Sequence, residues 1–146
     1  MTGSGDDQDI ELSRGLEGVQ VEIESLKVEL PDIYPKVTLR EVDAPRRELT
    51  FSIGTNEGIA LSIALSNIET PKPFTHQLLD MVLKEWELSL ESIFIGHFDG
   101  KSYSAELIIS SSKGSRRLSC RPSDALVLAT LQSRYVPIVI DANLLS

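Results

Sequence analysis

Apolar and polar residues alternate along several stretches of the chain, and this alternation predicts β-strands. The first stretch begins at Val19, where Val19, Val21 and Ile23 alternate with polar residues, and the pattern continues to Leu30, just before Pro31. A period of two residues places apolar side chains on one face of a strand and polar side chains on the other. We therefore expect a strand with one face open to solvent.

The same pattern predicts a hairpin over residues 36–53 and further strands downstream. The downstream segments with strand character are residues 92–98, 101–109, 116–120 and 136–140. Asp99-Gly100 connects the first two, and Asp-Gly is a strong signal for a tight hairpin turn. Pro137 lies in the last segment, and because proline cannot donate a hydrogen bond to a neighbouring strand, we expect an edge strand there.

Three stretches are predicted to be helical. The first follows Thr55, contains apolar residues from Ile59 to Leu65, and should be short and largely buried. The second runs from about Thr75 to Trp86 and spaces its apolar residues as one helical face; these residues are Leu78, Leu79, Val82, Leu83 and Trp86. We expect Thr55 and Thr75 to be N-caps.

The third helix begins after Arg121, its expected N-cap, and runs to about Gln132. Pro122 suits the first helical position, where a backbone N–H would have no partner. Hairpin-connected strands with helices between them indicate an α+β fold with mostly antiparallel pairing. We expect one domain over residues 19–146, preceded by a flexible acidic extension over residues 1–18.

Composition places the 146-residue chain among ordinary soluble globular proteins, with 41% hydrophobic and 25% charged residues. No apolar run is long enough to cross a bilayer, and the acidic start lacks the features of a signal peptide. The single cysteine, Cys120, rules out an internal disulfide. These observations favour a cytoplasmic protein. The net charge of −8 offers no long-range attraction for nucleic acid, which would need a local cationic patch.

Polar residues that could carry chemistry gather at the three predicted helix starts, which are intrinsic anion sites. Glu57 and Asp124 could hold a divalent cation, magnesium or manganese, that activates water against a phosphodiester. Each carboxylate could equally do no more than stabilise its helix start. His76 stands in a first turn, where the helix dipole favours the neutral imidazole that acts as a base or a ligand.

Arg121 could bind a phosphate through two hydrogen bonds, or could pair with Asp124 or Glu57. Ser123 follows in the same helix start. Cys120 stands beside Arg121, and a nearby cation can lower the pKa of a thiol, although a cysteine at this position is more often buried and inert. The pairs Arg46-Arg47 and Arg116-Arg117 would form a basic patch if the fold brought them together.

Five motifs in order resemble the pattern of the bifunctional nuclease (BFN) domain family. They are Ile53-Gly54-Thr55-Asn56-Glu57-Gly58, Pro73-Phe74-Thr75-His76-Gln77, Asp99-Gly100 with Tyr103, Ser119-Cys120-Arg121-Pro122-Ser123-Asp124-Ala125, and Val136-Pro137-Ile138. The resemblance covers about Val19 to Leu144. The chain departs from the family pattern at two positions, where Gln77 and Ser119 replace acidic residues.

The resemblance implies an α+β domain that hydrolyses DNA and RNA and that often self-associates, as a homodimer or a higher homo-oligomer. On this interpretation Glu57, His76 and Asp124 are catalytic, Glu57 and Asp124 hold the metal, and Arg121 and Ser123 bind substrate. The alternative is a non-catalytic ligand-binding, protein-interaction or regulatory module on the same fold, which the acidic charge and the two lost carboxylates favour.

Overall fold

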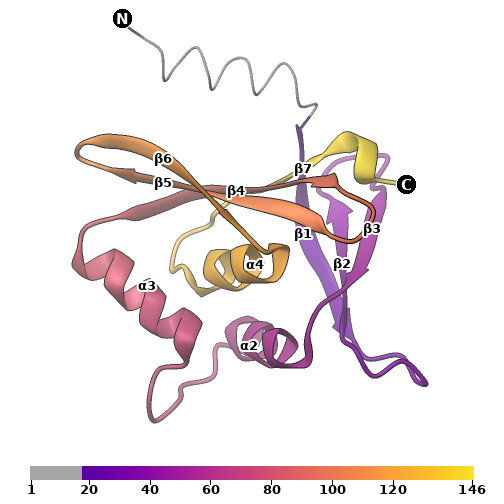
Figure 1. Cartoon of the computed structure of the whole chain (residues 1–146), viewed down its shortest axis with the longest axis horizontal. Coiled ribbons are helices and arrows are strands. Elements are labelled where there is room, and N and C mark those ends of the chain that lie inside the picture. The colour runs from indigo at the N-terminus through magenta and orange to yellow at the C-terminus, as the bar shows by residue number, and fades with distance from the viewer. Residues whose placement is uncertain (1–17) are drawn as a thin grey trace, which may run out of the picture.

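The computed structural model describes residues 18–146 (Figure 1). The expected extension over residues 1–18 lies outside the described residues apart from Gly18, which begins the first strand. The elements in chain order are β1 (Gly18–Lys27), β2 (Lys36–Glu41), β3 (Glu48–Ser52), α2 (Thr55–Ser66), α3 (Thr75–Glu85), β4 (Ser89–Phe98), β5 (Tyr103–Ser111), β6 (Gly114–Cys120), α4 (Pro122–Leu131), β7 (Ile138–Asp141) and a short 3₁₀ helix (Ala142–Leu144). Three α-helices and one sheet in the described part confirm the predicted α+β class.

The seven strands form one sheet in the order β3-β2-β1-β7-β4-β5-β6. Every pairing is antiparallel except that of β4 with β7. The prediction of an edge strand near Pro137 was wrong, because β7 lies between β1 and β4 in the middle of the sheet. Pro137 fits there because it precedes β7 and contributes only its carbonyl, which accepts a hydrogen bond of 3.1 Å from Ile93 N.

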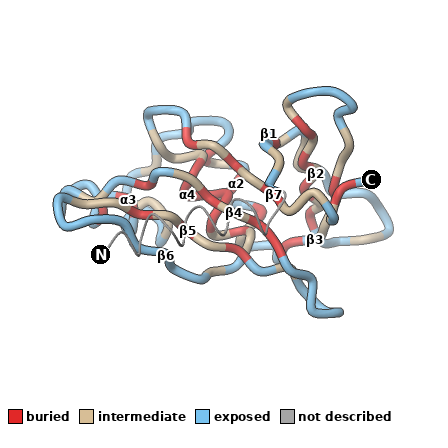
Figure 2. Tube along the Cα trace, turned by 90° about the horizontal axis from the view of Figure 1, so that it is seen from above, coloured by how far each residue is buried: buried red, intermediate tan, exposed pale blue. Residues whose placement is uncertain are grey.

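Helix α4 is the centre of the core. Its apolar residues Ala125–Ala129 are all buried, and the sheet curves over the helix on one side while α2 and α3 pack against it on the other (Figures 1 and 2). A helix that is apolar on every side needs neighbours all round. The start of α4 is therefore held in a fixed place, where Arg121 is the N-cap as predicted.

The N-caps of the other two helices each lie one residue before the predicted threonine. Gly54 is the N-cap of α2 and Phe74 that of α3, so that Thr55 and Thr75 are the first helical residues. The side-chain oxygen of Gln77 accepts a hydrogen bond of 2.7 Å from Phe74 N. This contact is the backward half of a capping box, and it gives Gln77 a role at the helix start.

Helices α2 and α3 are more exposed than their apolar residues suggest. In α2 only Gly58, Leu61 and Ala64 are buried. The predicted apolar face of α3 exists, but of its five residues only Leu83 is buried, and Trp86 is 75% exposed. Asp80 is the other buried residue of α3 and binds Gln132 Nε2 at 2.8 Å.

None of the helices described has both the length and the apolar character needed to cross a membrane.

Candidate functional site

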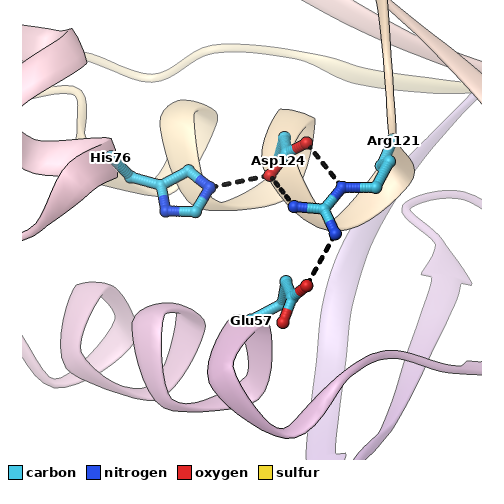
Figure 3. A network of polar contacts seen from close by, with 4 residues as sticks. All are labelled: Glu57, His76, Arg121 and Asp124. Atoms are coloured by element: carbon cyan, nitrogen blue, oxygen red, sulfur yellow. Dashed lines mark hydrogen bonds and ion pairs between the residues drawn. The ribbon is translucent and has the colours of Figure 1, made fainter.

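The starts of α2, α3 and α4 meet around a four-residue polar network of Glu57, His76, Arg121 and Asp124 (Figure 3). His76 Nε2 donates to Asp124 Oδ1 at 2.8 Å. Arg121 donates to both oxygens of Asp124, at 2.9 and 3.0 Å, and to Glu57 Oε1 at 2.6 Å. The structure thus joins residues that stand 64 positions apart in the chain into one connected group.

Local packing explains how Glu57 reaches this position. A Cβ atom on Gly54 would lie 2.7 Å from Glu57 Oε2. The glycine at the N-cap of α2 therefore leaves room for the carboxylate to fold back toward Arg121. One turn further along, a Cβ atom on Gly58 would lie 2.5 Å from Cγ of Pro35, so Gly58 allows α2 to pack closely against the turn before β2.

Burial and charge set the protonation states of Asp124 and Arg121. Burial raises the pKa of Asp124, but hydrogen bonds from Arg121 and His76 outweigh burial and hold that pKa below its usual value. The same hydrogen bonds to Asp124 and Glu57 raise the pKa of Arg121. Asp124 is therefore an anion and Arg121 a cation at neutral pH, and Arg121 remains accessible, with 62% of its side chain exposed.

The tautomer of His76 follows from its contact. A carboxylate can only accept a hydrogen bond, so Nε2 of His76 carries the hydrogen and Nδ1 of the neutral ring keeps a lone pair. Figure 3 shows Nδ1 on the side of the ring turned away from Asp124. The arrangement matches a base oriented by a third group, as in the general base pairs of hydrolases.

Two pockets open on either side of Arg121 and share only Arg121 and Glu57. The first, which we call the histidine pocket, has a volume of about 560 Å³ and includes His76, Asp124 and Cys120. The second, which we call the aromatic pocket, has a volume of about 700 Å³ and includes Phe51, Phe98, Tyr103 and the buried Ser123. The network therefore lies between the two pockets, with Arg121 and Glu57 lining both.

The sequence singled out the network residues and Ser123 but not the rest of the aromatic pocket. Lys36, Phe98, Lys101 and Tyr103 come from separate strands and turns. The Asp99-Gly100 signal places Phe98, Lys101 and Tyr103 near one turn, but no local signal connects this turn with Lys36 or with the start of α4. Only the register that pairs Phe98 with Tyr103, together with the curvature of the sheet, brings them together.

The other candidate residues take different roles. Burial and the charge of Asp124 raise the pKa of the Cys120 thiol to about 11, so this thiol is not activated as a nucleophile at neutral pH. The two arginine pairs belong to opposite edges of the sheet and form no common patch. Three of these arginines face carboxylates: Arg47 binds Glu41 at 2.9 Å, Arg46 lies 3.6 Å from Glu22 and Arg117 lies 3.9 Å from Glu106.

A divalent cation does not fit between Glu57 and Asp124 as the side chains stand. Both carboxylates bind the guanidinium of Arg121, which occupies the space between them (Figure 3). Within residues 18–146 no three or more His, Cys, Asp and Glu side chains are grouped to hold a metal ion. Metal binding by Glu57 and Asp124 stays a prediction, and it requires Arg121 to move away.

Comparison with known proteins identifies the family. The sequence profile of the bifunctional nuclease domain matches residues 37–146, which is more than half of the chain. The chain belongs to the bifunctional nuclease domain family. It is also similar to uncharacterized proteins from two strains of Mycobacterium tuberculosis, with 28% identity over 127 residues, covering 87% of this chain and 74% of each relative.

Membership of the bifunctional nuclease domain family confirms the resemblance drawn from the five motifs. The matched region contains all four network residues. The family name connects the domain with nuclease function, whereas the curated relatives carry no assigned activity.

Proposed function

We propose that this protein hydrolyses phosphodiester bonds of DNA and RNA at the network of Glu57, His76, Arg121 and Asp124. The observation that carries the proposal is the contact of 2.8 Å between His76 and Asp124, made beside an arginine that is 62% exposed. A base oriented by a carboxylate and an accessible guanidinium are two parts that phosphodiester hydrolysis needs.

Each residue has a defined task in this proposal. Arg121 binds the non-bridging oxygens of the phosphate and offsets the charge that develops on them. His76 Nδ1 takes a proton from the water that attacks phosphorus, the bond from phosphorus to the leaving oxygen breaks, and that oxygen takes a proton from solvent. Asp124 keeps the ring of His76 in the required tautomer and stabilises the imidazolium that forms.

Glu57 has a different task from Asp124. Its carboxylate binds the Nη1 atom of Arg121 at 2.6 Å, on the side of the guanidinium away from Asp124 (Figure 3). Glu57 therefore positions the guanidinium, and it also competes with a phosphate for that cation. This route assigns no step to a metal ion, because the carboxylates that would hold one are occupied by Arg121.

The experiment is cleavage of fluorescently labelled DNA and RNA oligonucleotides by the purified protein, compared with the variant His76→Gln. Loss of a general base lowers the rate by about 10²- to 10⁴-fold. The matched control is His97→Asn, since His97 is exposed at the end of β4 and asparagine tolerates its φ of 31°. Equal activity in the wild type and in His76→Gln would indicate a contaminating nuclease and refute the proposal.

The same cleavage experiment, repeated with EDTA, tests whether hydrolysis requires a divalent metal ion. Cleavage that continues in the presence of EDTA supports the route through His76 alone. Cleavage that stops with EDTA and returns with magnesium or manganese supports Glu57 and Asp124 as metal ligands, with Arg121 displaced.

A second candidate function is a non-catalytic ligand-binding or regulatory module. The specific observation in its favour is that the charged groups of the network already bind one another: Arg121 donates hydrogen bonds to both carboxylate oxygens of Asp124 and to one of Glu57. On this alternative the wild type does not cleave nucleic acid, and Asp124→Asn changes only the free energy of unfolding. Self-association, which the family resemblance implies, stays a prediction.

A further inference from the structure

The aromatic pocket is lined by aromatic and basic residues that take no part in the four-residue network. It lies on the far side of Arg121 from His76 and is lined by the end of β3, the tip of the β4–β5 hairpin and the start of α4. Its volume of about 700 Å³ is in the range of small-molecule sites. A pocket of this size next to a phosphate-binding arginine has room for a further part of the substrate.

Three aromatic rings stand in a row along this pocket. The ring centroids of Phe98 and Tyr103 are 4.7 Å apart at an interplanar angle of 33°, and those of Tyr103 and Phe51 are 5.7 Å apart. Phe51 and Tyr103 are partly buried against the core, whereas Phe98 is 47% exposed at the open end of the row. The inner rings fix the position of the row, and the outer ring is available to a planar ligand.

A β-bulge places Phe98 at this position. The register of β4 against β5 shifts between Gly96 and Phe98, which leaves His97 without a partner and sets Phe98 opposite Tyr103. Bulges re-aim side chains, and they are common beside functional sites. Without the extra residue, Phe98 would fall on the other face of the strand, because side chains alternate between the two faces.

The charges around the pocket favour an anion. Lys36, Lys101 and Arg121 line it, and Glu57 is its single acidic residue. Lys36 also lies 3.6 Å from Asp32, and Arg121 binds Asp124 outside the pocket lining, so Lys101 is the lining cation for which the structure of residues 18–146 shows no ion pair. A ligand with one planar aromatic group and one phosphate matches both features, and a nucleotide unit has this chemistry.

We propose that the aromatic pocket is the subsite for the nucleobase next to the phosphate held by Arg121, with the base stacked on Phe98. This inference rests on the proposed function for the identity of the substrate. Inside a duplex both faces of a base are covered by its stacked neighbours, whereas a base of a single strand can leave the stack and contact a protein ring. The pocket therefore selects single-stranded nucleic acid over a duplex of the same sequence.

The test is direct binding, so that it does not depend on turnover. Fluorescence anisotropy measures the affinity of the His76→Gln protein for a labelled single-stranded oligonucleotide, for its duplex, and for an abasic strand of equal length and charge. Phe98→Ala should weaken binding of the single strand roughly tenfold, because it removes one stacking platform. Binding of the abasic strand should stay unchanged, and Phe98→Trp should restore affinity for the single strand.

The matched control is Leu118→Ala on β6, since Leu118 is 51% exposed and does not line the pocket. The inference would be overturned if the parent protein and Phe98→Ala bound the single strand with equal affinity. It would also be overturned if the parent protein bound the abasic and normal strands equally well, or bound no strand at all. A wild type that binds single strands through Phe98 and cleaves none would refute the hydrolysis and leave the subsite standing. A wild type that cleaves, with unaltered binding in Phe98→Ala, would refute the subsite alone.

Discussion

The Nε2 atom of His76 donates a hydrogen bond of 2.8 Å to Oδ1 of Asp124, which lies 48 positions further along the chain. This contact ties the start of α3 to the start of α4, and Arg121 extends it to the start of α2. The site therefore consists of three helix starts held together by charge. The proposed activity and part of the stability therefore depend on the same carboxylate.

Replacing Asp124 by asparagine should separate these two contributions. The amide side chain would keep the volume but lose the charge that fixes the tautomer of His76, and the corresponding change in a catalytic triad lowers kcat by about 10⁴-fold. The lost charged hydrogen bonds should lower the free energy of unfolding by about 1–3 kcal/mol. Oligonucleotide cleavage and urea denaturation measure the two effects, and a folded variant that cleaves as fast as the wild type would remove Asp124 from the mechanism.

The depressed pKa of Asp124 predicts how its contribution to stability depends on pH. The contribution is complete above the unfolded pKa of an aspartate, about 3.9, and is lost as the pH falls through the lower folded pKa. In a His76→Gln background, which removes the imidazole that donates to Asp124, the loss of unfolding free energy caused by Asp124→Asn should therefore be constant near neutral pH. It should shrink below about pH 4. Urea denaturation of His76→Gln with and without Asp124→Asn from pH 7 to pH 3 measures it, and a difference that grows with acidity would contradict the assigned direction.

Replacing Glu57 by glutamine should distinguish a positioning role from metal ligation. Because Arg121 is 62% exposed, loss of this ion pair should cost less than about 1 kcal/mol of stability. If Glu57 only competes for Arg121, then Glu57→Gln should bind inorganic phosphate or an oligonucleotide more tightly than the wild type. If Glu57 is a metal ligand, the variant should instead lose the cleavage that magnesium or manganese supports. Calorimetry with phosphate tests the competition for Arg121, and the cleavage assay with magnesium or manganese tests the role as a metal ligand.

Gly54→Ala offers an independent way to move the same carboxylate. The new Cβ atom would lie 2.7 Å from Glu57 Oε2, and the end of this flexible side chain can move aside while the extended backbone at Gly54, φ −66° and ψ 157°, accepts alanine. The variant should therefore fold and should shift affinity for phosphate in the same direction as Glu57→Gln. In the double variant the two shifts should not add, because both act through one contact. Fully additive shifts would show that Gly54 acts elsewhere.

Local sequence patterns were sufficient to locate the helix starts that build the network. Arg121, Pro122 and Asp124 mark a helix start because a cap, a first-turn proline and a first-turn acid satisfy local backbone groups. Such signals lie within a few residues of one another. For this reason the polar residues of the site could be named before their contacts were known.

Features that depend on distant parts of the chain could not be predicted in this way. Helical spacing showed that α3 has an apolar face, but not that Leu78 and Trp86 on that face stay exposed. The central place of β7 depends on its pairing with β1 and β4, which local composition does not encode. Asp99-Gly100 marks the hairpin that brings Phe98 near Tyr103, but local composition does not encode the bulge that sets Phe98 opposite Tyr103.

Asp80 provides a final prediction, about what holds α3 against α4 and so holds His76 near Asp124. Its carboxylate is 7% exposed and accepts hydrogen bonds from Lys84 Nζ at 2.6 Å and from Gln132 Nε2 at 2.8 Å. Asp80→Ala leaves the amide of Gln132 without this partner and should lower the free energy of unfolding by about 1–3 kcal/mol. Lys84→Ala is the matched control, since Lys84 is 53% exposed and its loss should cost less than about 1 kcal/mol. Urea denaturation compares the two variants, and an equal effect of both would mean that the contact with Gln132 does not anchor the helix.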